Sequence, residues 1–178
     1  EKGTAMGFSA SPSYANLTMG WWEQKIAWSH ENERFVNKVV MWLRFIDDLF
    51  IMWAGTHKEF DEYFKVLNQN SVGLTFTYET SQTEIVYLDT RIYTADEKVQ
   101  TSLHRKSTAT NAVLHACSHH PKNLIWSIPY GEFLRIKRIC SESEEFEKHS
   151  TDTWKRFQAR AYPKKVIAQS LQRVAELS

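Results

Sequence analysis

Residues 39–53 read VVMWLRFIDDLFIMW, two short apolar runs on either side of a charged turn. The runs at 39–43 and 49–53 are typical of buried strands, because each is short and rich in branched and aromatic side chains. Asp47 and Asp48 lie between them, and adjacent aspartates favour turns. The stretch therefore predicts a β-hairpin that carries two carboxylates at its turn.

Helices are expected on both sides of this hairpin. Ser11 and Pro12 are typical of an N-cap and a first helical residue, and they predict a helix that continues to about Trp28. Thr56 and Glu59 have the spacing of a capping box, and apolar residues then recur every three or four positions, as on one face of a helix. The first part of the chain thus combines a hairpin with two helices.

Further strands are expected at 74–78, 85–93 and 99–104, with a turn at 94–97. Consecutive strands without long helices between them indicate an antiparallel, α+β fold.

Helical periodicity returns in the last third of the chain. It predicts helices at 132–140, at 142–161 after a capping box at Ser141 and Glu144, and from Pro163 onward. We therefore expect two domains, a mixed one over residues 1–121 and a helical one over residues 122–178.

The composition indicates an ordered, intracellular chain. The 178 residues are 42% hydrophobic and 13% aromatic, which is enough apolar surface for a packed core. The longest apolar stretch, 49–54, is far shorter than the ~20 residues of a membrane-spanning helix, so no membrane partner is expected. Two cysteines are too few for a disulfide scaffold, which favours a reducing compartment. Because Glu1 is not an initiator methionine, the chain is expected to be a piece of a longer protein.

Charge is distributed unevenly along the chain, although the formal net charge is only +1. Residues 41–97 hold four basic residues against ten acidic ones, and residues 98–138 hold seven basic residues against the single acid Glu132. This arrangement is expected if one part holds cations and the next contacts a polyanion. The candidate contacts to a nucleic-acid backbone are Arg105, Lys106, Arg135 and Arg138. The alternative is a solvated basic face, which is the more common fate of such runs.

Asp47 and Asp48 are the candidate catalytic and metal-binding residues. Two like charges held together at a turn are unfavourable unless a cation neutralises them. Mg²⁺ (or Mn²⁺) binds through one or two carboxylates together with substrate phosphates, and such sites perform two-metal phosphoryl transfer. The alternative is an ordinary solvated Asp-Asp turn.

Several motifs follow one another along the chain: KGTAMG with SPSYANL, RFIDDLFIMW, YLDTRIY, LHRKSTATN and IPYGEFLRIKRIC. Together they resemble the reverse transcriptases of Penelope-like retroelements, over nearly the whole chain. FIDD at 45–48 resembles the aromatic-x-Asp-Asp motif on the palm hairpin of that family.

The resemblance implies a polymerase-like fold, with an antiparallel-sheet palm and its packing helices over residues 1–121 and an α-helical thumb over residues 122–178. The implied activity is that of an RNA-directed DNA polymerase, which transfers nucleotides to a primer 3′-OH. The implied partners are an RNA template, a DNA primer and deoxynucleoside triphosphates, and the implied location is the nucleus. The residues implied on the nucleotide and template side are Met6, Gly7, Phe8, Ser11 and Pro12, and those at the primer end are Phe45, Leu88 and Asp89.

The chain departs from the family pattern because parts of the polymerase are missing from its sequence. The fingers and the first palm strand, which carries another metal-binding aspartate, are expected in the parent chain rather than in these residues. We therefore expect the isolated fragment to be inactive, because two-metal transfer needs both ions fixed. The alternative function is a polymerase-derived module that binds template and primer without catalysis.

Overall fold

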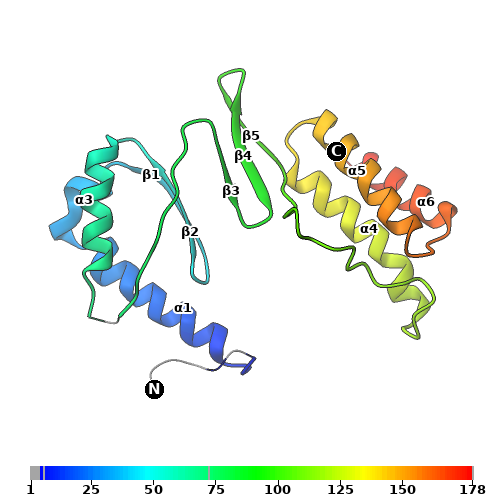
Figure 1. The fold of residues 1–178 in the computed structure, drawn as a ribbon, viewed down its shortest axis with the longest axis horizontal. Helices are drawn as coiled ribbons and strands as arrows, with labels where there is room; N and C mark the ends of the chain where they lie inside the picture. Colours follow the sequence, from blue (N-terminus) through cyan, green and yellow to red (C-terminus); the bar gives the residue numbers. More distant parts are fainter. Residues whose placement is uncertain (1–4, 6, 72, 178) are drawn as a thin grey trace. The chain divides into compact units, whose positions relative to one another are not determined.

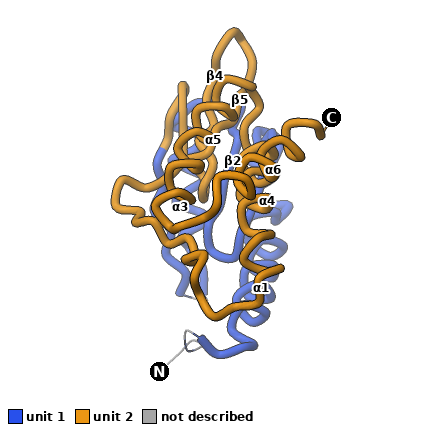
Figure 2. The backbone as a smooth tube through the Cα atoms, turned by 90° about the vertical axis from the view of Figure 1, so that its right-hand side faces the viewer, with its two compact units in different colours: residues 1–79 blue, residues 80–178 orange. Residues whose placement is uncertain are grey.

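The computed structural model of the chain describes residues 5, 7–71 and 73–177. The chain forms two compact units, residues 1–79 and residues 80–178, each with its own hydrophobic core (Figure 2). Both units contain helices and a small antiparallel sheet, so the fold class is α+β, as expected from the sequence.

Unit 1 is built around the predicted hairpin (Figure 1). Its elements are α1 (Ser11–Trp22), a π-helical turn η1 (Glu23–Ala27), a 3₁₀ turn η2 (His30–Asn32), α2 (Glu33–Val36), β1 (Val39–Phe45), β2 (Asp48–Trp53) and α3 (His57–Asn68). β1 and β2 pair antiparallel, and Phe45 is the partner of Asp48. This register leaves Ile46 and Asp47 as a two-residue turn, which confirms the predicted hairpin.

The helix α3 packs against the hairpin through Phe60 and Tyr63, whose rings contact Trp53 on β2. Its predicted capping box forms, because the Thr56 side chain accepts from the backbone of Glu59 and the Glu59 side chain accepts from the backbone of Thr56. A hydrogen bond from Lys38 and the bonds from Thr56 hold the pKa of Glu59 at about 2. Tyr63 and Leu67 on its apolar face are buried in the core of unit 1.

Residues 74–78 do not form the predicted strand. Two asparagine side chains satisfy the backbone instead: Asn70 bonds the N–H and C=O of Leu74, and Asn68 bonds the N–H and C=O of Phe76. Leu74 and Phe76 still pack on the core, so the alternating pattern is real. The strand prediction was wrong because side-chain amides replace the neighbouring strand.

The first helix begins and ends differently from the prediction. Ala10 is its N-cap residue, and the Ser11 hydroxyl donates to the carbonyl oxygen of Ala5 at 2.7 Å rather than capping the helix. The α-helix ends at Trp22, where the backbone widens into the π-helical turn η1. Sequence periodicity does not separate these two kinds of helix, because both continue the same apolar pattern.

Unit 2 combines a three-stranded sheet with three helices (Figure 1). Its elements are β3 (Glu84–Tyr87), β4 (Thr90–Ala95), β5 (Lys98–Leu103), α4 (Lys122–Ile139), α5 (Ser143–Gln158) and α6 (Lys164–Ala175). The strands are antiparallel in the order β3-β4-β5. The predicted strand at 85–93 is therefore two strands, divided by a turn at Leu88 and Asp89.

Two helical predictions in unit 2 also change. The helix expected from residue 132 begins at Lys122 and continues through Pro129, which is fully buried. The capping box expected at Ser141 does not form, because the Ser141 hydroxyl accepts from the backbone N–H of Thr101 on β5. Tertiary contacts in both places outweigh the local signals.

The boundary between the compact units lies at residues 79 and 80, whereas the sequence predicted a division at 121 and 122. The sheet belongs with the helices because Leu103 on β5 and Ala116 are buried in the same cluster as Phe133 and Phe157. The helical part nevertheless begins at Lys122, where it was expected to begin. The functional division at residue 121 stays a prediction.

We expect the stability of unit 2 to fall as the pH is lowered from 7 to 5. Ser102 on β5, which is buried, bonds both Glu145 and His149 on α5. Burial lowers the pKa of His149 from its usual 6.5, so below that pH the unfolded chain takes up a proton that the folded chain resists. The hydrogen bond from Ser102 lowers the pKa of Glu145, so its contribution is lost only below the usual carboxyl pKa of 4.5, outside this pH range. Thermal unfolding at pH 7, 6 and 5 measures the effect, and His149→Gln should remove it.

Candidate functional site

The two candidate carboxylates lie at the tip of the β1–β2 hairpin. Asp47 is the second turn residue, Asp48 is the first residue of β2, and both are exposed. Ile46, the first turn residue, has a φ of 54°. A β-branched residue in the left-handed region costs about 1–3 kcal/mol, and such strain concentrates at functional sites. The turn is therefore a defined structure and a candidate site.

A clamp of polar side chains fixes this turn against the preceding helix. The Arg44 guanidinium donates to Glu23 Oε1 at 2.8 Å, to Asn16 Oδ1 at 2.9 Å and to the carbonyl oxygen of Ile46 at 3.1 Å. Trp42 Nε1 donates to the same oxygen of Glu23 at 2.8 Å. No role for Arg44, Glu23 or Asn16 was predicted from the sequence. The signal was present, however, because an arginine inside an apolar strand requires a buried partner.

Arg44→Leu is expected to destabilise unit 1 by about 2–3 kcal/mol, because it leaves the Glu23 carboxylate, whose side chain is 16% exposed, without its guanidinium. Arg34→Leu is the matched control, because its ion pair with Glu62 is largely exposed and contributes less than about 1 kcal/mol. Hydrogen exchange in the hairpin and α1 measures the difference. Equal effects of the two substitutions would contradict the clamp.

The predicted nucleotide-side segment is only partly described. Gly7 has a φ of 89°, which suits glycine, and Phe8 is exposed. Ser11 and Pro12 occupy the first turn of α1, while Met6 lies outside the described residues. The segment's role in nucleotide binding stays a prediction.

The predicted primer-end residues occur at two similar hairpin tips, one in each unit. Leu88 has a φ of 56°, so the β3–β4 turn repeats the β1–β2 pattern of an aliphatic residue with positive φ followed by aspartate. Phe45 and Leu88 are both exposed apolar side chains. Asp89 forms an ion pair with Arg135 on α4, which fixes the β3–β4 turn on the helical part of unit 2.

A cavity of about 540 Å³ in unit 2, here called the arginine cavity, brings most of the predicted backbone contacts together. The β3–β4 turn, the segment after β5, and helices α4 and α5 form its walls. The charged and imidazole side chains that line it are Asp89, His104, Arg105, Lys106, Glu132, Arg135 and Arg156. Cations exceed carboxylates among them, so the cavity attracts anions.

Arg105 and Arg156 are the least exposed arginines of this cavity, each with a side chain that is 23% exposed. The Arg105 guanidinium donates to Thr153 Oγ1 at 2.8 Å and lies 3.8 Å from Asp152, an exposed carboxylate that also pairs with Arg156 at 3.6 Å. Burial and the neighbouring Arg156 lower the pKa of Arg105. Arg105 was predicted from the sequence, whereas Arg156 was missed because it lies 51 positions further along the chain.

The basic residues near the end of α4, which are Arg135, Lys137 and Arg138, have different surroundings. Arg135 lines the arginine cavity, and Arg138 is exposed on the same helix. The Lys137 ammonium donates to the carbonyl oxygens of Val174 at 3.0 Å and Ala175 at 3.2 Å, where it caps the end of α6. Lys137 therefore has a structural role, although the sequence places it within the basic run.

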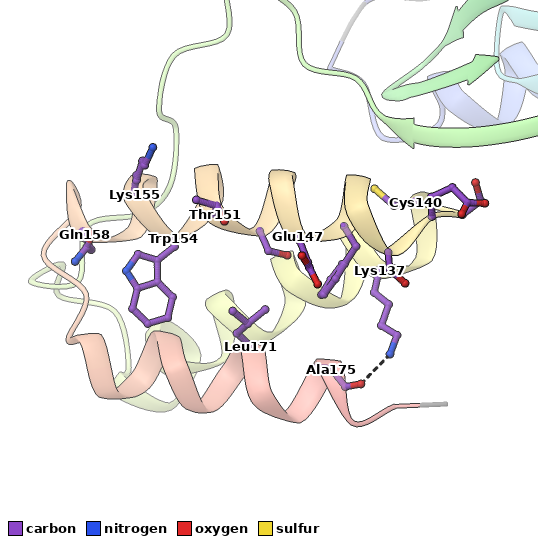
Figure 3. A pocket seen from close by; sticks show the side chains of 14 residues that line it. Lys137, Cys140, Glu147, Thr151, Trp154, Lys155, Gln158, Leu171 and Ala175 are labelled. Atoms are coloured by element: carbon purple, nitrogen blue, oxygen red, sulfur yellow. Dashed lines mark hydrogen bonds between the residues drawn. The ribbon is translucent and has the colours of Figure 1, made fainter. Parts of the chain in front are cut away.

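A second cavity, of about 860 Å³, lies between α5 and α6 (Figure 3). Phe146, Trp154 and Leu171 supply its apolar walls, and the buried Ser150 hydroxyl on its wall has no hydrogen-bond partner among the described residues. Its lining contains as many carboxylates as amines. This cavity therefore lacks the positive charge that a nucleic-acid backbone requires.

Metal binding was tested against the arrangement of acidic side chains. Among the described residues, no group of three or more His, Cys, Asp or Glu side chains is placed to hold a metal ion. Asp47 and Asp48 supply oxygen donors of the kind that Mg²⁺ uses together with substrate phosphates. Metal binding at these two carboxylates stays a prediction.

The comparisons with known proteins identify one segment. Residues 112–172 match the model of the animal helix-turn-helix domain, a DNA-binding domain type, and they include nearly all of α4, α5 and α6. No curated protein and no solved structure matches the chain. None of the described helices has the length and apolar character needed to cross a membrane.

This match corrects the resemblance drawn from the motifs. The matched family is a helix-turn-helix domain and not a reverse transcriptase family, so the assignment to Penelope-like reverse transcriptases is wrong. Short motifs suggested that family, whereas the match rests on the pattern of a whole helical segment. The expected thumb region, residues 122–178, is thus similar over most of its length to a helix-turn-helix domain.

Proposed function

We propose that the chain binds a nucleic-acid duplex through the helical part of unit 2. The observation that carries this proposal is the match of residues 112–172 to a DNA-binding domain type. The arginine cavity supports it, because its side chains contact the same helices and its cations suit a phosphate backbone.

The arrangement of α5 and α6 suits this function. A short turn joins them, with Ala161 in the left-handed region at a φ of 60° and Pro163 as the N-cap of α6. In helix-turn-helix proteins the second helix lies in the major groove with its first residues at the base edges. The exposed polar side chains of α6 are Lys164, Lys165, Gln169, Gln172 and Arg173, and the first of them lie at the start of the helix.

Titration of a fluorescent 20-base-pair duplex with the chain tests the proposal. Binding is expected to weaken steeply between 50 and 200 mM salt, because phosphate contacts release counterions. Lys165→Gln with Gln169→Ala should reduce discrimination between duplex sequences if α6 reads bases. Absence of duplex binding at 50 mM salt would refute the proposal.

A second candidate function is RNA-directed DNA synthesis, with Asp47 and Asp48 as the metal-binding carboxylates. Strain at Ile46 and the Arg44 clamp favour it, because they fix the backbone of the turn from which both carboxylates extend, and two-metal transfer needs carboxylates at a fixed position. A bound Mg²⁺ would neutralise phosphate charge of the deoxynucleoside triphosphate. An RNA template, a DNA primer and a nuclear location belong to this candidate. If the carboxylates have no such role, the chain is a binding module only.

We expect the chain to bind Mn²⁺ weakly at this turn and to show no primer extension alone, because only two carboxylates lie there. Asp47→Asn with Asp48→Asn should remove the site, as measured by the electron paramagnetic resonance signal of free Mn²⁺.

Asp96→Asn with Glu97→Gln is the matched control, because these residues form the acidic β4–β5 turn. An equal loss of Mn²⁺ binding in both double variants would indicate nonspecific attraction. Primer extension by the chain, abolished by Asp47→Ala, would show that further ligands are not needed.

A further inference from the structure

The arginine cavity gathers three guanidinium groups and the Lys106 ammonium against three carboxylates, those of Asp89, Glu132 and Asp152, none of which is buried. Arg105 and Arg156 share the carboxylate of Asp152, whose side chain is 58% exposed, at 3.8 and 3.6 Å. Arg135, the third, lines the same cavity. Ion pairs with exposed carboxylates are weak, so these arginines can exchange such partners for another anion. The cavity is therefore suited to an anionic group.

Arg135 already has an anionic partner in the β3–β4 turn. Its guanidinium forms an ion pair with the Asp89 carboxylate, and Glu132 lies farther away at 3.8 Å. The backbone N–H of His104 donates to the Asp89 carbonyl oxygen at 2.7 Å. This bond fixes the β3–β4 turn beside the cavity. A carboxylate and a phosphate present similar oxygens to an arginine. Asp89 thus contacts Arg135 as a phosphate would.

We propose that the arginine cavity holds one phosphate group of a bound nucleic-acid strand and that Asp89 is a built-in competitor for Arg135, released when the phosphate binds. This inference rests on the proposed nucleic-acid binding and adds a regulated contact to it. Both side chains of the ion pair are partly exposed, 49% for Arg135 and 39% for Asp89, so the pair opens at low cost.

Asp89→Asn is expected to tighten binding of a 20-base-pair duplex by about three- to fivefold, because it removes the competitor and an exposed pair contributes about that factor. Glu84→Gln is the matched control, since it removes the same charge from the same hairpin. Its partner is Arg91 at 2.7 Å, and neither residue lines the cavity. The control should change the affinity by less than about 1.5-fold, the effect of net charge alone.

A double-mutant cycle assigns the effect to Arg135. In an Arg135→Gln background, Asp89→Asn should no longer tighten duplex binding, because the guanidinium that Asp89 would release to the phosphate is absent. A gain equal to that of the Glu84→Gln control, or a gain that persists without Arg135, would overturn the inference.

Titration with inorganic phosphate shows whether the cavity binds free phosphate or binds a phosphate group only as part of a nucleic-acid strand. The arginine side-chain NMR signals of the Asp89→Asn chain should shift at lower phosphate concentrations than those of the Glu84→Gln chain. If phosphate produces this difference while no duplex binds, the competition stands and the proposed function fails. If duplex binds but neither probe distinguishes the two variants, the proposed function stands and the competition is refuted.

Discussion

Phe133→Ala is expected to lower the free energy of unfolding of unit 2 by about 3–5 kcal/mol and to leave unit 1 folded. Phe133 on α4 is completely buried, and its ring lies 5.9 Å from that of Phe157 on α5. Truncation removes this aromatic pair and leaves a cavity between the helices of unit 2. Unit 1 has a separate core around Trp22 and Tyr63, so it should not be affected.

Hydrogen exchange along the chain measures this effect element by element. Phe133→Ala should remove protection from α4, α5 and α6 while α1 and α3 keep theirs. Trp22→Ala is the reciprocal variant, because Trp22 is fully buried in unit 1 and should affect only that unit. Loss of protection in both units from either substitution would show that the two cores unfold together.

Elements that depend only on residues close together in the sequence were predicted correctly. The capping box at Thr56 involves residues three positions apart, and the hairpin depends on two adjacent apolar runs, so both were correct. The capping box at Ser141 failed because its hydroxyl bonds to Thr101, 40 positions away, and no local pattern indicates that partner. The strand at 74–78 failed for another reason. Asn68 and Asn70 lie only four to eight positions away, but an alternating apolar pattern does not show that side-chain amides, instead of a strand, bond the backbone.

The parts of the candidate site that could be proposed from the sequence are those whose residues are neighbours in the chain. Asp47 and Asp48 are adjacent in the sequence and share one turn. The clamp from Arg44 to Glu23 and the pairing of Arg135 with Asp89 join residues 21 and 46 positions apart, so only the structure reveals them. The same limit explains Lys137, which lies within the basic run of the sequence but caps α6.

Arg135→Gln with Arg138→Gln is expected to flatten the salt dependence of duplex binding by about two charge equivalents. Each phosphate contact contributes roughly −0.9 to the slope of log K against log salt on B-DNA, and these arginines are exposed three positions apart on α4. Discrimination between duplex sequences should hardly change, because phosphate contacts position the duplex without reading bases.

A structural role for the same arginines makes a different prediction. Arg135 pairs with Asp89 and Glu132, and its side chain is 49% exposed. Its loss should therefore cost less than about 1 kcal/mol of stability. Arg91→Gln with Lys98→Gln is the matched control, because it removes two positive charges from the sheet of unit 2 and none from the arginine cavity. Titrations at several salt concentrations, measured beside thermal unfolding, separate the two roles. An unchanged slope with a lowered melting temperature would assign Arg135 and Arg138 to the fold alone.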